Sequence, residues 1–355
     1  MENAEIKNET LKAFDCSNCG AGLKYKPGTT TLMCEYCNTK NIIPQEQTII
    51  KENDFVAYLE KLESENSVVE ETLQCKSCGA ASTININSKS SDCPYCSTPL
   101  IDASTKEDRA IKPQYLLPFK IDKQKAAQLG YNWAKNTWFT KKIQPSFIDL
   151  SAVYVPHWTF DVQTNTNYAL EKKQVNGNNT YLQSTSGNLS LFFDDVVVPA
   201  SGTVDANLLA KVGPWITKNL VNTNDQYLSD YIVEKYKLGL KQGFYVGKRA
   251  VDEAIRSKIS SQFGIGSNIT IKSIQSQYND IKFKHILLPL YVATYDYNGQ
   301  KNIFYVNGNT GAVAGIRPKS PIFLFLKKIA FVIILIIGFF TMLIILLTWL
   351  GFMAQ

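Results

Sequence analysis

The hydrophobic pattern of the central part of the chain changes its period from one segment to the next. From residue 153 to 162 every second residue is apolar or aromatic, which predicts a strand with an aromatic inner face. Its Pro156 favours a sheet edge or a bulge, because proline cannot donate to a sheet ladder. Residues 187–198 predict a second strand. Residues 248–263 repeat apolar side chains every three to four positions, which predicts a helix with four inward residues: Val251, Ile255, Ile259 and Phe263.

A three-stranded antiparallel meander is predicted further along. Asn298-Gly299 supplies the positive φ angles of a tight hairpin turn, and the glycine-rich residues 307–311 mark a second turn. The three strands expected around these turns cover residues 286–297, 302–306 and 312–316. With the segments above, this predicts an α+β domain over residues 114–318, called the middle domain below.

The last apolar run is longer and uninterrupted. Residues 329–353 include no charged side chain, and a helix of this length spans about 37 Å, enough to cross a bilayer. Lys327 and Lys328 precede it directly, so the positive-inside rule keeps the N-terminal side in the cytoplasm. We therefore predict a membrane anchor over residues 322–353, with a transmembrane helix at about 329–353 and single-pass localisation in a bacterial cytoplasmic membrane.

The eight cysteines fall into two copies of one spacing, Cys-x2-Cys-x14-Cys-x2-Cys, offset by 59 residues. Paired Cys-x-x-Cys turns at this separation are typical of four-thiolate metal sites. The copies also agree around the ligands, since Tyr36 matches Tyr95 and Thr39 matches Thr98. The expected metal ligands are Cys16, Cys19, Cys34 and Cys37 in the first copy and Cys75, Cys78, Cys93 and Cys96 in the second.

A site with four thiolates has no open coordination position, so we expect two structural zinc ions that do no chemistry themselves. Iron or redox dithiols suit the same ligands as alternatives. Disulfides are the other alternative, but the N-terminal residues lack the apolar core of a secretory signal, which favours a reducing compartment. Each small module should fold only when its metal is bound.

These patterns predict a multi-domain chain with two small zinc-ribbon β modules, the α+β middle domain and one C-terminal transmembrane helix. Ribbon one covers residues 14–43 and ribbon two covers residues 73–101. A linker with a short helix at 44–72 joins the ribbons, and a second linker, at 102–113, precedes the middle domain. This second linker predicts that a ribbon can unfold while the middle domain stays folded.

Charge is divided unevenly along the chain. Residues 1–110 hold 11 Lys and Arg against 17 Asp and Glu, whereas the whole chain carries a formal net charge of +6. Nucleic-acid-binding modules usually show a basic face, because neutralising phosphates supplies most of their affinity. The acidic ribbon region therefore counts against nucleic acid as the main partner, although Lys24, Lys26 and Lys40 can form a local basic patch.

No catalytic motif is recognisable. His157 and His285, the two histidines, lie in no metal-binding or triad pattern and are expected to be structural. Asp194-Asp195 is better interpreted as a turn or strand end than as an acid/base pair. The glycines around Gly243 and Gly247 do not match a phosphate loop. We therefore expect that the chain is not an enzyme.

The chain resembles a family of bacterial membrane-anchored zinc-ribbon proteins of the TFIIB type, the YdjG-like proteins. The resemblance rests on CSNCGAGL and CEYCNT in ribbon one, CKSCGA and CPYCST in ribbon two, and AVYVPHWTFD and YVNGNTGAVAGIRPKSP in the middle domain. Family members are often labelled primosomal replication helicases, but this sequence has no Walker motif. The resemblance implies a partner of flotillin-like (SPFH) or phage-shock proteins in a membrane-stress complex.

Two functions follow from these expectations. The first is a membrane-anchored cytoplasmic adaptor whose ribbons bind protein partners, and the alternative is a membrane-tethered nucleic-acid-binding or transcription-related protein. The candidate partner-binding positions are Leu23, Tyr25, Tyr36 and Tyr95, together with the helix face of Phe55, Leu59 and Leu62, with packing of the ribbon cores as their other possible role.

Overall fold

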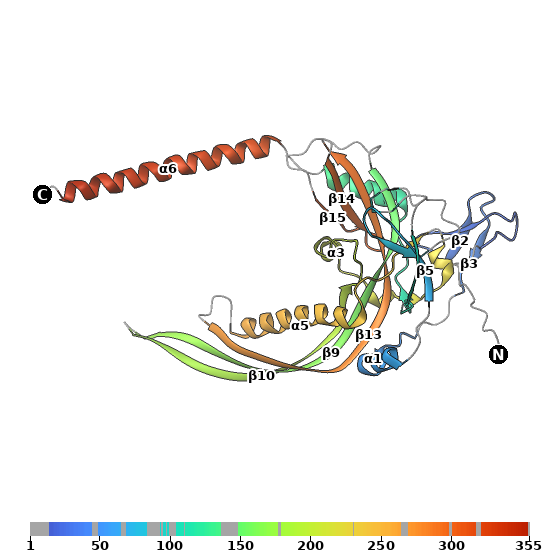
Figure 1. Cartoon of the computed structure of the whole chain (residues 1–355), viewed down its shortest axis with the longest axis horizontal. Coiled ribbons are helices and arrows are strands. Elements are labelled where there is room, and N and C mark those ends of the chain that lie inside the picture. The colour runs from blue at the N-terminus through green and yellow to red at the C-terminus, as the bar shows by residue number, and fades with distance from the viewer. Residues whose placement is uncertain are drawn as a thin grey trace.

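The computed structural model describes residues 14–44, 49–64, 69–83, 93, 95–96, 98, 104–109, 111–135, 148–176, 179–229, 231–263, 269–297, 300–316 and 321–353. A long, curved antiparallel sheet dominates it (Figure 1). Its main strands run in the order β10-β9-β13-β14-β15. Their bounds are β9 Ile148–Asn176, β10 Asn179–Pro199, β13 Ile269–Tyr297, β14 Gln300–Asn307 and β15 Val313–Gly315.

The predicted meander is present in β13, β14 and β15. Tyr297 pairs with Gln300 at its first turn, and the Gly311 amide donates to the Asn307 carbonyl at its second. Asn298 and Gly299 lie outside the described residues. The strand predicted at 153–162 is the middle of β9, where both faces are buried. Pro156 lies where β9 exchanges β10 for the short parallel strand β12 (Ile232–Val233) as its neighbour.

Helix α5 (Leu240–Gln262) covers the concave side of the long strands and begins eight residues earlier than predicted (Figure 1). Gly243 and Gly247 are buried residues of these additional turns, at positions where the periodicity would need apolar side chains. A Cβ at Gly243 would lie 2.6 Å from a ring atom of Trp158, and one at Gly247 would lie 3.1 Å from Val198. These glycines let the first turns of α5 approach the sheet closely, a packing role that the sequence alone does not reveal.

Shorter elements complete the middle domain. Helix α2 begins after Asp122, whose carboxylate accepts from the Lys125 amide. Helix α3 is capped in the same way by Asp205. The bounds are β8 Tyr115–Leu116, α2 Lys123–Lys135, α3 Ala206–Val212, the 3-10 helix Thr217–Asn219, β11 Val221–Asn222 and α4 Asp225–Leu228.

Each ribbon contributes a three-stranded antiparallel sheet of its own. Residues 104–109, expected to be linker, form a strand that pairs with β5 along six residues. The bounds in ribbon one are β1 Leu23–Tyr25, β2 Thr31–Cys34 and β3 Lys40–Ile42, and the second sheet contains β5 Val69–Gln74, β6 Ala81–Thr83 and β7 Ser104–Arg109.

The segment between the ribbons is held against the long sheet. Strand β4 (Asn53–Asp54) pairs with β13, and helix α1 (Phe55–Ser64) follows it directly. The Phe55 ring is buried against Phe160, Phe244 and Phe283. This segment therefore fixes the path of the chain from one ribbon to the other.

Helix α6 (Pro321–Met353) points away from the body of the molecule (Figure 1). A bilayer crossing needs about 20 consecutive apolar residues. Among the residues that the structure describes, no helix combines the necessary length and apolar character. The predicted transmembrane helix at 329–353, and with it the single-pass membrane localisation, is corrected by this finding.

Candidate metal centres

The four cysteines of ribbon one converge as their spacing predicts. The Cys16 and Cys37 sulfurs are 3.5 Å apart, and the Cys19 and Cys34 sulfurs are also 3.5 Å apart. All four ligand atoms lie within 4.8 Å of one another. Ribbon two repeats the arrangement, with 3.7 Å between one pair of sulfurs and 3.5 Å between the other, the pairs being Cys75–Cys96 and Cys78–Cys93.

These separations fit zinc. A tetrahedron with Zn–S bonds of about 2.3 Å places its sulfurs about 3.8 Å apart. A disulfide needs about 2.05 Å between sulfurs, and all eight cysteines are free. The two clusters can each hold one structural zinc ion, which closes the coordination sphere with protein ligands only. The choice of zinc over disulfides is thereby confirmed.

The first turn of each ribbon has a backbone conformation that brings its two cysteines to the same side. Gly20 and Gly79, which follow the second cysteine of each copy, adopt φ angles of +71° and +73°. Such left-handed angles are readily available to glycine, and they let each glycine amide donate to the carbonyl of the first cysteine. The two copies therefore agree in the backbone conformation of this turn as well as in the spacing of their cysteines.

A threonine hydroxyl supports the last ligand of each cluster. Thr39 Oγ1 lies 3.1 Å from the Cys37 sulfur, and Thr98 Oγ1 lies 3.1 Å from the Cys96 sulfur. Hydrogen bonds from Thr39 lower the pKa of Cys37 to about 5. Burial raises the pKa of Cys96, but hydrogen bonds with Thr98 outweigh it and leave this pKa at about 6. Both contacts favour the thiolate, which is the form that binds metal.

Ribbon one packs on the middle domain through strand β1. The Tyr25 ring lies edge-on to Tyr227 at 5.1 Å, and its hydroxyl donates to the Phe119 carbonyl at 3.1 Å. The Ser229 hydroxyl donates to the Leu23 carbonyl at 2.8 Å. Because Leu23 and Tyr25 belong to the same buried cluster as the sheet residues, ribbon one is part of the central core.

Ribbon two packs on the middle domain through the turn between its last two cysteines. The Tyr95 hydroxyl donates to Glu234 Oε2 at 2.5 Å, and the Ser201 hydroxyl donates to Glu234 Oε1 at 2.6 Å. Glu234 is only 2% exposed, so burial raises the pKa of its carboxyl group, while the two hydroxyls oppose that rise. Both ribbons thus meet residues 227–234.

These contacts change the predicted partner-binding surface. Leu23, Tyr25 and Tyr95 are buried, and they take the packing role that the sequence left as an alternative. Phe55 is also buried and Leu59 packs beside it, while the Leu62 side chain lies outside the described part. Tyr36 differs from the rest because it is 82% exposed.

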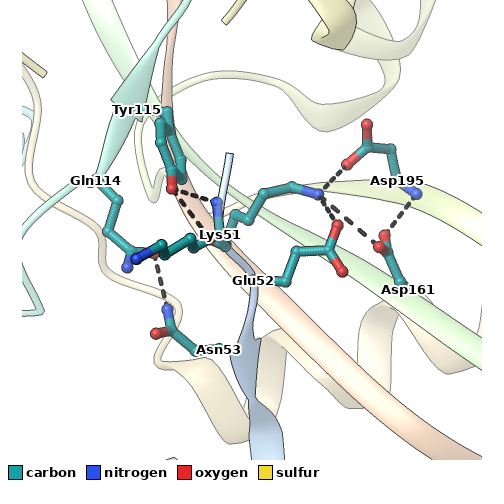
Figure 2. A network of polar contacts seen from close by, with 8 residues as sticks. Lys51, Glu52, Asn53, Gln114, Tyr115, Asp161 and Asp195 are labelled. Atoms are coloured by element: carbon teal, nitrogen blue, oxygen red, sulfur yellow. Dashed lines mark hydrogen bonds and ion pairs between the residues drawn. The ribbon is translucent and has the colours of Figure 1, made fainter. Parts of the chain in front are cut away.

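A second polar cluster holds the inter-ribbon segment on the sheet. The Lys284 ammonium is 2.8 Å from Glu52 Oε1, 2.8 Å from Asp195 Oδ1 and 3.9 Å from Asp161 Oδ2 (Figure 2). The Asp161 carboxylate also accepts from the Asp195 amide at 2.8 Å, across a bulge in β10 where Asp195 adopts a φ angle of 49°.

The ionisation of this cluster follows from its burial. Burial raises the pKa of Asp161 to about 7, and the nearby Glu52 carboxyl adds to the rise. Burial alone would lower the pKa of Lys284, but the Asp195 and Glu52 carboxylates outweigh it and raise this pKa. Lys284 is thus held as a cation among the carboxylates. Its charge compensates the buried acidic side chains, which therefore have a structural role.

The two histidines are buried and neutral. Burial lowers the pKa of His157 and of His285 to about 4. The Nδ1 atom of His157 lies 2.9 Å from the Val155 carbonyl, and that of His285 lies 2.7 Å from the Ile111 carbonyl. His285 therefore helps fix the entry to the middle domain, which agrees with its expected structural role.

Sequence reasoning did not identify the importance of residues 227–234 or of Lys284. The tyrosines and Glu234 have no spacing that marks them as contacts to the ribbons. The available signal for Lys284 was its position two residues before the apolar run 286–292, because a charge beside a buried strand needs a partner.

Comparisons with known proteins agree with part of the expected resemblance. The chain is 26% identical over 321 residues to the uncharacterized protein YdjG of Bacillus subtilis (strain 168), covering 87% of this chain and 90% of that protein. No family model matches, so the TFIIB-type assignment stays a prediction, and no solved structure matches either. The chain is therefore similar to YdjG along most of its length and carries two four-cysteine clusters suited to structural zinc.

Proposed function

We propose that this chain is a non-enzymatic adaptor that presents a zinc-ribbon surface to protein partners. The observation that carries the proposal is the way in which the ribbons are built and mounted. Their closed four-thiolate clusters leave no open ligand position, and both modules are fixed to residues 227–234. Such an arrangement suits presentation of a surface in a fixed orientation.

The outer face of ribbon one is the proposed contact surface. Tyr36 is 82% exposed and Ile42 is 76% exposed. Aromatic side chains that project from a rigid support are frequent anchors of protein interfaces, because they bury a large area at a low cost in conformational entropy. The family resemblance suggests flotillin-like (SPFH) or phage-shock proteins as the partners.

The test is site-specific photo-crosslinking in cells that express the full chain. A photoreactive phenylalanine derivative replaces Tyr36 in one variant and, as a matched control, Tyr181 on β10, which is 45% exposed. We expect protein adducts from position 36 and none from position 181. Equal labelling at both positions contradicts the proposal, and a nuclease-sensitive adduct at position 36 supports the nucleic-acid alternative.

A further inference from the structure

A groove of about 610 Å³ lies between ribbon one and the middle domain. Ribbon one supplies Tyr25 and the loop that leads into β2, and the middle domain supplies Pro118, Val221 and Tyr227. The sequence suggested a local basic patch that includes Lys26 and Lys40, but not its pairing with the middle domain, because the two walls are about 90 to 200 residues apart along the chain. The groove exists only while ribbon one is seated on the domain.

The groove is positively charged. Its lining includes Lys26 and Lys40 from ribbon one and Lys120 from the middle domain, and none of the described residues that line it is acidic. All three lysines are exposed, and none of them forms an ion pair with another described residue. Two of its three lysines come from residues 1–110, a region in which acidic residues outnumber basic ones by 17 to 11.

The walls between the lysines are partly apolar and partly lined by hydroxyl groups. Val221 and Pro118 supply apolar surface, and three consecutive threonines of ribbon one supply hydroxyls. The Thr29 and Thr31 hydroxyls are 2.9 Å apart and hydrogen-bonded to each other. Such a lining fits a ligand that combines negative charge with apolar side chains and groups that hydrogen-bond.

The groove is also preformed. The Gly28 amide donates to the Phe119 carbonyl at 2.9 Å, and the Tyr25 hydroxyl donates to the same carbonyl. Gly28 has a φ angle of +75°, and an added Cβ would lie 3.1 Å from the Lys120 carbonyl oxygen. The ribbon loop is thus held closely against the domain, so a ligand would not need to order this wall on binding.

We propose that this groove binds an extended acidic segment of the protein partner. Side-chain carboxylates of that segment pair with Lys26, Lys40 and Lys120, and an intervening apolar side chain packs on Val221 and Pro118. Charge complementarity carries the choice of occupant, because the described lining holds three lysines without an ion pair to a described residue and no carboxylate. The inference rests on the proposed adaptor function and assigns it a second contact beside Tyr36.

The test uses the full zinc-loaded chain and a fluorescent twelve-residue peptide of alternating glutamate and leucine. Binding is followed by fluorescence anisotropy. The groove variant combines Lys26→Gln, Lys40→Gln and Lys120→Gln. The control variant removes the same charge from three exposed lysines elsewhere, through Lys211→Gln, Lys241→Gln and Lys258→Gln. A peptide with glutamine in place of glutamate and a twelve-residue oligothymidylate serve as rival probes.

We expect the groove variant to weaken binding of the acidic peptide about tenfold, whereas the control variant binds as the wild type does. Equal losses in both variants, or binding of the glutamine peptide as tight as that of the glutamate peptide, overturn the proposal. Tighter, lysine-dependent binding of the oligothymidylate overturns it in favour of nucleic acid. If position 36 still cross-links a protein in the groove variant while peptide binding is unchanged, the groove inference fails and the adaptor function stands.

Discussion

Ribbon one and ribbon two share one cysteine pattern but contact the middle domain with different faces. Tyr36 and Tyr95 occupy the same position in the repeat, between its third and fourth cysteines. Tyr95 is 8% exposed and bonded to Glu234, whereas Tyr36 is 82% exposed. Ribbon one is attached through Tyr25 instead. The two copies thus share the metal site, but one of the equivalent tyrosines is packed against the middle domain and the other is exposed to solvent.

The two attachments also differ in chemistry. Ribbon one joins an aromatic cluster in which Phe119 stacks on Tyr231 at 4.5 Å and lies edge-on to Tyr154 at 5.1 Å. Ribbon two depends on a carboxyl group that burial has made costly to ionise. The first contact is mainly apolar, and the second is mainly a hydrogen bond to an ionisable group.

The largest expected difference comes from loss of one metal site at a time, through Cys34→Ser and Cys93→Ser. Each variant should retain one of two zinc ions by elemental analysis. Cys34→Ser should lower the free energy of unfolding by about 5 kcal/mol, and Cys93→Ser should lower it by about 3 kcal/mol. The effect of Cys34→Ser is larger because it releases both Leu23 and Tyr25 from the core.

Tryptophan fluorescence measures this effect in the middle domain, since neither ribbon contains a tryptophan. A chelator that removes both ions from the wild type serves as the control. Equal destabilisation by the two variants would contradict the difference in attachment, and a single zinc ion in the wild type would contradict the two-site model.

A smaller contrast is expected when a single hydroxyl is removed from each anchoring tyrosine. Tyr95→Phe leaves Glu234 Oε2 without the Tyr95 donor and should lower the free energy of unfolding by about 2 kcal/mol. Tyr25→Phe removes donation to two backbone carbonyls and should cost about 1 kcal/mol. Urea titrations of both variants measure the difference, and a larger loss for Tyr25→Phe would contradict it.

The pH dependence separates the two attachments further. The pKa of Glu234 is raised above its ordinary value of 4.5, so its contribution to stability is fully present below pH 4.5 and is lost as the pH rises through the folded-state pKa. The urea midpoint should therefore fall less steeply with rising pH in Glu234→Gln than in the wild type. Ser229→Ala, which removes a hydrogen bond from the middle domain to ribbon one, should leave that slope unchanged.

The smallest effect is expected at the exposed tyrosine. Tyr36→Ala should change the free energy of unfolding by less than about 0.5 kcal/mol, because its side chain is largely in solvent. The equivalent Tyr95→Ala should cost about 3 kcal/mol, since it removes a buried ring together with the hydroxyl bonded to Glu234. Thermal unfolding of the two variants in parallel measures this, and similar losses would show that Tyr36 is also packed.

Much of the local structure could be predicted from the sequence. The meander, the strand around Pro156 and the helix containing Val251 follow from short-range periodicity and turn residues. The sequence left partner binding and core packing open for Tyr25 and Tyr95, because an aromatic residue at a surface and one at an internal interface look alike in a single sequence, and their burial decides for packing. The transmembrane helix was corrected, although α6 is helical over the expected range.

The sequence by itself determined the two four-thiolate clusters, since ligand type and spacing within about 20 residues are enough to bring four sulfurs to one ion. Only the tertiary structure decided which face of each ribbon is buried, where Lys284 finds its carboxylates and how three lysines come to line one groove. These contacts join residues far apart along the chain. No local pattern encodes such pairs, because each forms only when separate segments pack together in the folded chain.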